Sequence, residues 1–266
     1  EIATGSFSSF GAGQVRFREL YDKEMVEKIS SLAASSGFPA GSEGDQEKNL
    51  DHGTMVPLYF INHYYRSYKL VRLGLSGLPL LSHYKMGQII AKASDLLNRR
   101  VVFIGSGDLS HCQKDDGPYG YRAEGPHYDE LLMKAMGKGN FGELFNFDPS
   151  LLENAEECGH RSFVIMAGTL DRLAIEPHAL SHEATFGVGY GVCSYLVTGP
   201  DPTRAFGDLY ESKTILKMKE KREHGDPLVK LAYASIDDWI LRHKRHEISP
   251  FFLSEELKQS AGAFVS

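Results

Sequence analysis

Residues 101–111 read VVFIGSGDLSH, and this stretch decides which fold class the sequence predicts. The run Val101–Ile104 is short and rich in β-branched residues, and it stops at a Gly-Ser-Gly turn signal. A strand buried on both faces has this pattern. Amphipathic stretches lie before and after it along the chain. The alternation predicts an α/β fold in which a mixed central β-sheet is flanked by helices.

Working outward, the spacing of apolar residues predicts further helices and strands. Helices are expected at residues 21–34, 56–63, 85–97, 128–136, 149–156 and 209–223. Residues 161–170 are apolar and too ambiguous for periodicity to assign, and a helix is favoured there. Strands are expected at residues 70–75 and 186–197. The second of these, FGVGYGVCSYLV, carries Gly187, Gly189 and Gly191, and alternating glycines let another backbone or a ligand approach one face of a strand closely.

His111 follows directly after the predicted strand 101–104. The carboxyl end of a strand is where α/β folds place their ligands. No Gly-Lys-Ser/Thr and no helix start follow the Gly-Ser-Gly turn, so a nucleotide-phosphate site is discounted. An imidazole titrates close to neutral pH, which makes His111 a candidate general acid or base. A purely structural histidine at a strand end is the alternative.

Two further segments carry side chains that bind metals. In LDHGTMVPL, His52 lies between a polar loop and a Pro-bearing helix start, and neutral imidazole is the commonest metal ligand. In EECGHR, Glu157 and Cys158 offer a carboxylate and a thiolate close together. The alternatives are a solvated loop histidine and a charged helix end with a packed cysteine. Composition alone favours the latter for EECGHR.

Composition excludes several classes of partner. The net charge is −6, so no broad electrostatic attraction to nucleic acid or to an anionic membrane is expected. No apolar run approaches the ~20 residues that cross a bilayer. Three cysteines without framework spacing favour a reducing cytoplasm. The secondary histidines His127, His160 and His182 are expected to be surface or packing residues.

Four stretches, taken in order, resemble the class III extradiol ring-cleavage dioxygenases, the LigB-like superfamily. They are LDHGTMVPLYFI, GSGDLSH with GPYGYRAEGPHYDE after it, ECGHRSFVIMAGTL and FGVGYGVCSYL, and the resemblance covers roughly residues 5–197. Four motifs in the right order are far more specific than any one of them.

The resemblance implies a non-haem metal site that works on a catecholic substrate with dioxygen. Fe(II) is the metal implied, held by two histidines and a carboxylate. His52 matches one metal-binding histidine of the family and His111 matches its acid–base histidine. Around the third ligand, ECGHR looks more like the Memo branch, so Cys158 is the first choice and Glu157 the second. A thiolate would shift the preference towards copper or zinc.

The resemblance also predicts what lines the substrate pocket. The glycine-rich strand near Cys193 and the loop that bears Tyr119 and Tyr121 are expected there. A homodimer is one arrangement that the sequence leaves open.

The ends of the chain carry two expectations of their own. The family's first metal-binding histidine lies before the segment that GSFSSFGAGQVRF resembles, and no histidine precedes His52 here. An N-terminal portion is therefore expected upstream of Glu1. Residues 226–266 look like the opening of an AMME-syndrome chromosomal-region domain, with a first strand at Ala263–Val265. The expected division is thus a dioxygenase or Memo-like domain (1–205), a helical linker (206–225) and the start of a second domain (226–266).

Three functional classes follow from these patterns. The first is a metal-dependent oxidoreductase that cleaves catecholic rings. The second is a Memo-like metal-binding protein that acts in a redox, signalling or modification pathway without cleaving rings, which Cys158 favours. The third is an interaction module that kept the fold and lost the site.

Overall fold

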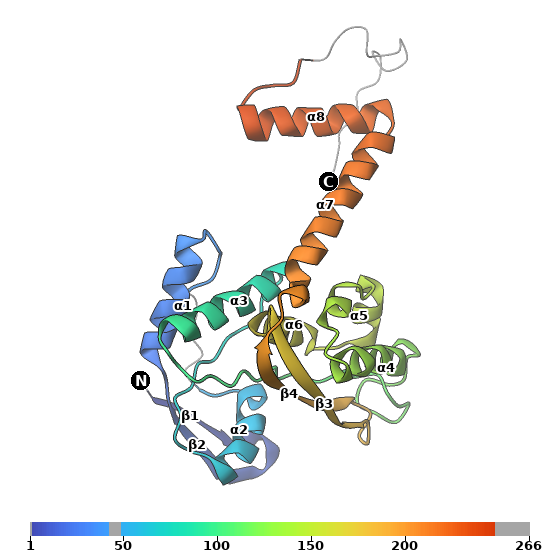
Figure 1. Ribbon diagram of the computed structural model, residues 1–266. Helices are drawn as coiled ribbons and strands as arrows, with labels where there is room; N and C mark the ends of the chain where they lie inside the picture. The colour runs from blue at the N-terminus through green and yellow to red at the C-terminus, as the bar shows by residue number, and fades with distance from the viewer. Residues whose placement is uncertain (1, 43–48, 248–266) are drawn as a thin grey trace. The chain divides into compact units, whose positions relative to one another are not determined.

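The computed structural model describes residues 2–42 and 49–247 (Figure 1). These residues contain α-helices, short 3-10 helices and four strands. The α-helices are α1 (Lys23–Ser35), α2 (His52–Tyr64), α3 (Leu80–Leu96), α4 (Glu124–Gly137), α5 (Pro149–Ala155), α6 (His160–Thr169), α7 (Phe206–His224) and α8 (Pro227–Arg242). The strands are β1 (Ile2–Phe7), β2 (Ala12–Leu20), β3 (Leu173–Glu183) and β4 (Tyr190–Pro200). The chain divides into two compact units, Glu1–Tyr210 and Glu211–Ser266.

The described strands form two separate antiparallel hairpins, β1–β2 and β3–β4. The mixed α/β class is therefore confirmed. The sequence predicts one central mixed sheet, whereas the described strands form two separate two-stranded sheets. The β1–β2 hairpin packs on α2 through a small apolar cluster that contains Phe17, Leu50 and Leu58. The β3–β4 hairpin lies beside α4.

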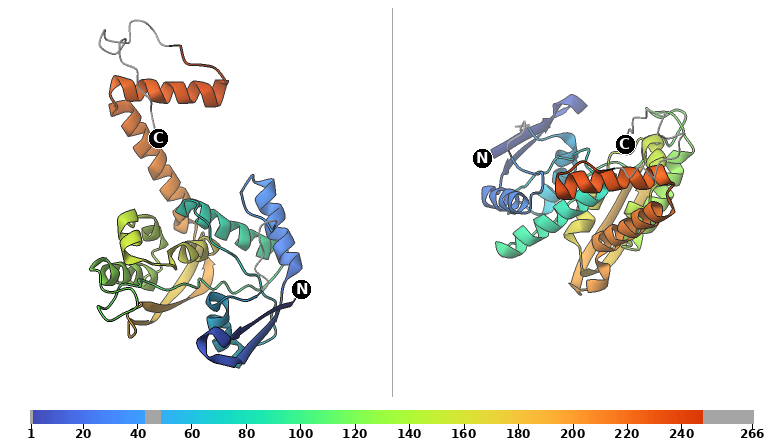
Figure 2. Two further views of the ribbon diagram at one scale, coloured as in Figure 1. Left: turned by 180° about the vertical axis from the view of Figure 1, so that it is seen from behind. Right: turned by 90° about the horizontal axis from the view of Figure 1, so that it is seen from above.

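Helices α1, α3 and α6 pack together, and α1 crosses beside α3 at an angle (Figures 1 and 2). Met25 and Ile29 of α1 meet Met86 of α3 in one apolar cluster. Helices α3 and α6 approach very closely, because a Cβ atom on Gly87 would lie 2.1 Å from the Ile165 carbonyl oxygen. Two backbones can come this near only where a glycine leaves out its side chain.

The largest apolar cluster joins α3, α4, α6 and the 3-10 helix η2 (Phe141–Phe145). Tyr84, Leu132 and Val164 are fully or almost fully buried in it. At about 25 cal/mol per Å² of apolar surface removed from water, such a cluster is the main source of stability for the elements around it. These same elements carry the candidate site.

Most predicted helices are confirmed. Residues 85–97 fall within or next to α3, residues 128–136 within α4, and residues 161–170 match α6 within a residue. Asp148 caps α5, since its side chain accepts from Ser150 N at 2.8 Å. Strand β4 begins at Tyr190, four residues later than predicted. Strands β1, β2 and β3 were not expected from the sequence. Strand β3 carries Pro177, which cannot donate to a sheet ladder and so argues against a strand.

The prediction of a buried strand at Val101–Ile104 is wrong for the described structure. No backbone group of residues 101–107 forms a backbone hydrogen bond with another described residue, and Val102 is 87% exposed. Residues 70–75 likewise form no strand beyond one bridge, Tyr21 with Leu70. β-branched residues favour an extended backbone, but a strand also needs a neighbour to pair with.

The second unit contains the later part of α7 together with α8. Asp226 caps α8 by accepting from Val229 N at 2.9 Å. Arg222 pairs with Asp237 at 3.0 Å and lies over the ring of Tyr233. The strand predicted at Ala263–Val265 lies outside the described residues.

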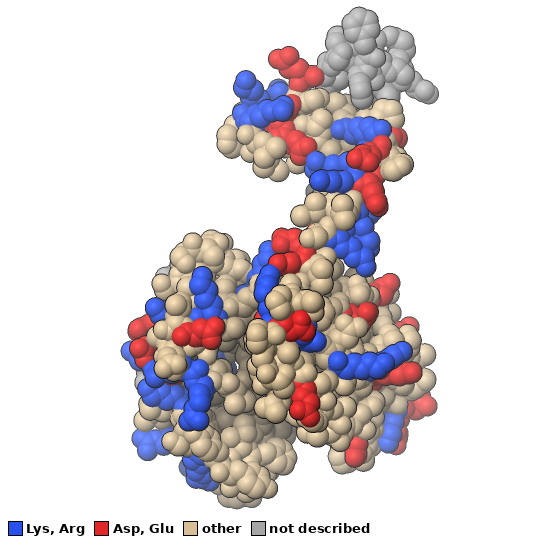
Figure 3. Space-filling model, viewed as in Figure 1, with Lys and Arg blue, Asp and Glu red and all other residues tan. Residues whose placement is uncertain are grey.

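Two surface properties bear on partners. On the face shown in Figure 3, basic and acidic side chains are interspersed. None of the described helices combines the length and the apolar character that crossing a membrane requires.

Candidate active site

The backbone around His111 is held from two sides. Leu109 N donates to the Gly189 carbonyl at 2.9 Å, and Gly189 N donates to the Ser110 carbonyl at 2.7 Å. On the other side, His111 N donates to the carbonyl of Ala155, the last residue of α5, at 3.1 Å. Together these bonds fix the path of the chain through the candidate acid–base histidine.

Ser110 is fully buried and makes three further hydrogen bonds. Its N–H donates to Asp129 Oδ1 at 2.9 Å, its hydroxyl donates to Ala155 O at 2.9 Å, and the same hydroxyl accepts from Cys112 N at 3.0 Å. Asp129 lies on α4 with a fully buried side chain, and its second oxygen is 2.9 Å from His182 Nε2. Burial raises the pKa of Asp129, while the bonds from His182 and Ser110 act in the opposite direction.

Two glycines let a distant part of the chain cross the Asp108 segment. A Cβ atom on Gly107 would lie 2.3 Å from Gly159 Cα, so any side chain there would force the two backbones apart. The crossing brings the sulfur of Cys158 against the Asp108 backbone, whose N–H donates to Sγ at 3.2 Å. Cys158 thus joins the same site as His111 although it lies on the connection between α5 and α6.

Asp108, His111 and Cys158 form a cluster whose potential ligand atoms all lie within 4.8 Å of one another. Within it, His111 Nε2 is 3.5 Å from Asp108 Oδ2. The imidazole stacks on the ring of Tyr119, with centroids 4.8 Å apart and planes at 28°. His111 Nε2 is buried and has no hydrogen-bond partner among the described residues. A buried nitrogen aimed at a thiol and a carboxylate, with no hydrogen bond of its own, fits a site for a metal ion or a substrate hydroxyl.

The surroundings of the Cys158 thiol favour its neutral form. Desolvation raises its pKa, and the carboxylates of Asp108 and Glu157 add to the rise, while the bond from the Asp108 N–H opposes it. A metal ion would displace the thiol proton on binding. All three cysteines are free.

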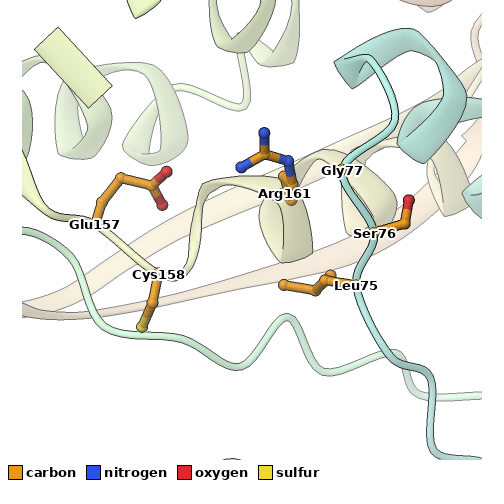
Figure 4. Close-up of a pocket in the computed structure, with 6 residues that line it drawn as sticks. All are labelled: Leu75, Ser76, Gly77, Glu157, Cys158 and Arg161. Carbon is orange, nitrogen blue, oxygen red and sulfur yellow. The ribbon is translucent and has the colours of Figure 1, made fainter. Parts of the chain in front are cut away.

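Glu157 is turned away from this cluster. Its Oε2 accepts from His160 N at 2.6 Å and so caps the start of α6, and burial raises its pKa. Figure 4 shows the Glu157 and Cys158 side chains on opposite sides of the chain. Of the two predicted third ligands, the structure brings only Cys158 into the His111 cluster.

His52 is the first residue of α2 and is exposed. Asp51 caps the helix by accepting from Thr54 N at 2.9 Å. Gly53, the residue after His52, accepts a hydrogen bond from Ser106 Oγ at its carbonyl oxygen, at 2.6 Å. This bond ties the start of α2 to the chain two residues before Asp108. The His52 ring itself packs near Phe10 and is not a member of the cluster around His111.

A cavity of about 280 Å³ lies beside Cys158 (Figure 4). Its lining combines one basic, one acidic and one apolar side chain with a thiol and a short loop. The residues are Leu75, Ser76, Gly77, Glu157, Cys158 and Arg161.

Of the secondary histidines, His160 has a packing role. It is fully buried, its Nε2 donates to Leu144 O at 2.9 Å, and the Tyr128 hydroxyl lies 3.2 Å from its Nδ1. Burial lowers the pKa of His160 to about 4, so it is neutral at physiological pH. His127 is exposed, and His182 is bonded to Asp129.

Sequence reasoning missed three residues of this region: Asp108, Asp129 and Arg161. Asp108 had a usable signal, since it lies three residues before His111 in the same motif. Arg161 lies in the EECGHR motif, in which only the potential metal ligands Glu157 and Cys158 were predicted to have a role. Asp129 had no local signal, because its partners Ser110 and His182 are distant in sequence.

Comparison with known proteins identifies a family. Residues 3–193 match the family described as the catalytic LigB subunit of aromatic ring-opening dioxygenase. Protein CA_C1420 of Clostridium acetobutylicum is 38% identical over 273 residues, an alignment that covers 99% of this chain and 58% of that protein.

Two named dioxygenases match at lower identity. The 4,5-DOPA dioxygenase extradiol of Beta vulgaris is 30% identical over 128 residues, covering 47% of this chain and 46% of that protein. The 3,4-dihydroxyphenylacetate 2,3-dioxygenase of Escherichia coli is 28% identical over 143 residues, covering 51% of this chain and 50% of that protein. The chain spans about half the length of the curated relatives that it matches.

Proposed function

This chain belongs to the family of the catalytic LigB subunit of aromatic ring-opening dioxygenases, and we propose on that premise that it is a metal-dependent oxygenase that opens the ring of a catecholic substrate with dioxygen. The names of the Beta vulgaris and Escherichia coli relatives support a dihydroxyphenyl substrate. The observation that carries the proposal is the cluster of Asp108, His111 and Cys158 on segments that the family match includes.

The side chains present fit a transition-metal ion. The thiol of Cys158 lies in one cluster with the carboxylate of Asp108, and such sulfur and oxygen donors beside each other suit a transition-metal ion such as iron, copper or zinc. We assign Cys158 and His52 as metal ligands, with Glu157 as the fallback for Cys158. Fe(II) is our first choice of metal, with copper or zinc as alternatives because thiolate is softer than carboxylate. When bound, the metal would supply Lewis acidity and the redox chemistry for dioxygen.

His111 is assigned the proton transfer. Its Nε2 is free to take a proton from a catechol hydroxyl and to return it later in the reaction. Stacking on Tyr119 and the contact with the Asp108 carboxylate at 3.5 Å hold the ring in the site. The fixed backbone on both sides of His111 limits its motion, which keeps Nε2 aimed into the site.

The test of this assignment is metal analysis of freshly purified protein, followed by oxygen uptake with a panel of catechols. Bound iron with uptake is the expected result. His111→Phe should lower uptake at least a hundredfold while the metal content stays within twofold of wild type. Loss of the metal in a folded His111→Phe protein would instead make His111 a ligand, and the acid–base assignment would then be wrong.

Cys158→Ser tests the ligand assignment. Replacing a soft thiolate with a hydroxyl should lower metal content at least tenfold. The matched control is Cys193→Ser, which changes a half-buried thiol on β4 outside the cluster. Equal metal content in wild type and both variants would remove Cys158 from the site.

A second candidate function is a Memo-like metal-binding protein that acts in a redox, signalling or modification pathway and leaves rings intact. The specific observation in its favour is a thiol where ring-cleaving relatives use a carboxylate. Metal content without oxygen uptake on any catechol would support this candidate over the first. Absence of both would support an interaction module that kept only the fold.

We also propose that residues 226–266 begin a domain similar to the AMME-syndrome chromosomal-region family. Helix α8, capped by Asp226, supports an ordered start to this segment. The three free cysteines support a cytoplasmic location.

A further inference from the structure

Tyr190 is the first residue of β4, and hydrogen bonds just before it fix its position. Gly189 bonds to the backbone of residues 109–110 through both its N–H and its carbonyl group. Two residues earlier, the Gly187 carbonyl accepts from Gln113 N at 3.0 Å. The two segments therefore run in opposite directions, which places Tyr190 across from the residue that precedes 109–110.

The residue across from Tyr190 is Asp108, a member of the candidate metal cluster. Side chains alternate between the two faces of a strand. The positions on either side of Tyr190 face α4, because a Cβ atom on Gly189 or Gly191 would meet side chains of that helix. The Tyr190 side chain therefore points away from α4, and residues that lie across from each other place their side chains on the same face.

The Tyr190 hydroxyl is a donor near the cluster. It makes no hydrogen bond with another described residue, and the side chain is 44% exposed. Partial burial raises the pKa of Tyr190, and the negative charges that Asp108 and Cys158 can carry raise it further. The hydroxyl therefore keeps its proton at neutral pH and can donate a hydrogen bond to a ligand.

We propose that Tyr190 is a further catalytic residue of this site, whose hydroxyl donates a hydrogen bond to a ring oxygen of the bound catechol. The inference deepens the proposed ring-opening function and rests on it. His111 would take the proton of a catechol hydroxyl, which leaves a negative charge on that oxygen. A hydrogen bond to a charged oxygen is roughly twice as strong as one between neutral groups, so Tyr190 would stabilise the deprotonated catechol.

The first experiment measures binding without turnover. 4-Nitrocatechol is titrated into the full chain as purified, with its own metal and without dioxygen, so that no ring is opened. We expect wild type to bind it and Tyr190→Phe to bind it at least tenfold more weakly, with metal content within twofold. The matched control is Tyr64→Phe, which removes the hydroxyl of a tyrosine that is 93% exposed at the end of α2. Equal affinities of wild type and Tyr190→Phe, or no binding to wild type, would overturn the proposal.

The absorption spectrum of the bound probe reports on the hydrogen bond itself. 4-Nitrocatechol absorbs differently once a hydroxyl has lost its proton. Without the Tyr190 donor, a smaller share of the bound probe should be deprotonated, whereas Tyr64→Phe should give the wild-type spectrum. Weaker binding to Tyr190→Phe with an unchanged spectrum would mean that Tyr190 only shapes the site, and the proposed hydrogen bond would be wrong.

Oxygen uptake separates this inference from the proposed function. If wild type opens catechol rings, Tyr190→Phe should lower kcat/KM at least tenfold. If wild type opens no ring but binds 4-nitrocatechol more tightly than Tyr190→Phe does, the hydrogen bond stands and ring opening fails. If wild type and Tyr190→Phe turn over equally, ring opening stands and the role of Tyr190 fails.

A purely structural role would be visible in stability. Because the hydroxyl has no hydrogen-bond partner among the described residues, Tyr190→Phe should melt within a few degrees of wild type. A clearly lower Tm would mean that the hydroxyl supports the fold, and it would overturn the assignment to the bound catechol.

Discussion

His111 owes its position to groups that never touch its ring. The N–H of Ser110 is fixed by the buried carboxylate of Asp129, and the other oxygen of that carboxylate is fixed by His182. A carboxylate enclosed in this way is costly to bury, and it persists where a second group compensates for the lost hydration. Asp129 and His182 therefore hold the backbone beside His111, the histidine that we assign to proton transfer, in place.

Asp129→Asn tests whether this carboxylate positions His111. The asparagine keeps an acceptor for Ser110 N but loses the charge that binds His182, so the loop should be held less firmly. We expect turnover to fall roughly ten- to hundredfold with unchanged metal content, because small displacements of a reacting group have effects of this size. The matched control is Glu130→Gln, an exposed neighbour on α4.

The same variant has a stability signature with a defined sign. Burial raises the folded-state pKa of Asp129 above its unfolded value, so the folded protein binds this proton more tightly than the unfolded chain does. The protonated Asp129 side chain therefore adds to the free energy of unfolding below about pH 4, and this contribution is lost as the pH rises through the folded-state pKa. Asp129→Asn should therefore lose less free energy of unfolding between about pH 4 and pH 7 than wild type in urea titrations. Parallel pH profiles for the two proteins would contradict a raised pKa.

Glycines decide how the elements meet around the site. A Cβ atom on Gly189 would lie 2.0 Å from Asp129 Oδ2, and one on Gly191 would lie 2.6 Å from Met133 Sδ. Side chains of α4 make these two close approaches, whereas the sequence predicts another backbone or a ligand there. At the Gly107–Gly159 crossing, the missing side chains likewise allow close contact between the two segments that carry Asp108 and Cys158.

Gly107→Ala should therefore damage both the fold and the cluster. The added methyl group meets backbone atoms of Gly159, which have no rotamer to change, so we expect a loss of about 1–3 kcal/mol in the free energy of unfolding. Metal content should fall as well, because Cys158 moves away from Asp108. Gly74→Ala is the control, since no atom lies within 4 Å of a Cβ there. The prediction fails if both variants unfold at the same urea concentration.

The sequence predicts the helices well, but it does not predict which distant segments meet. Helices α3 and α4 follow from periodic burial against one cluster, which is a local property, whereas α6 is apolar along most of its length and periodicity did not assign it. The strand at Val101–Ile104 was predicted from local preference, yet pairing depends on distant segments and is missing among the described residues. The meeting of Cys158 with His111 is also non-local, so spacing left it open, and family resemblance was needed to select both residues.

At the scale of the whole molecule, the contacts extend the first unit beyond the boundary expected from the sequence. The expected first domain ends at residue 205, whereas the compact unit ends at Tyr210. Tyr210 stacks on Phe145 with centroids 4.5 Å apart and planes at 16°, and Phe206 packs edge-on against Phe141. The first turns of α7 therefore belong to the core that holds α4, α6 and the site.

Two truncated chains measure this boundary. A chain that ends at residue 210 keeps both aromatic contacts and should unfold in one transition within a few degrees of the first transition of the full chain. A chain that ends at residue 205 loses the Phe206 and Tyr210 rings. Both rings are partly buried against this cluster, so the loss of each should cost less than the about 3–5 kcal/mol of a fully buried aromatic side chain. Each kcal/mol shifts Tm by about 2–4 °C in a domain of this size, so scanning calorimetry should show a Tm at least about 5 °C lower for the shorter chain. Equal melting of the two chains would mean that these rings add nothing to the core, and the unit would then end at residue 205.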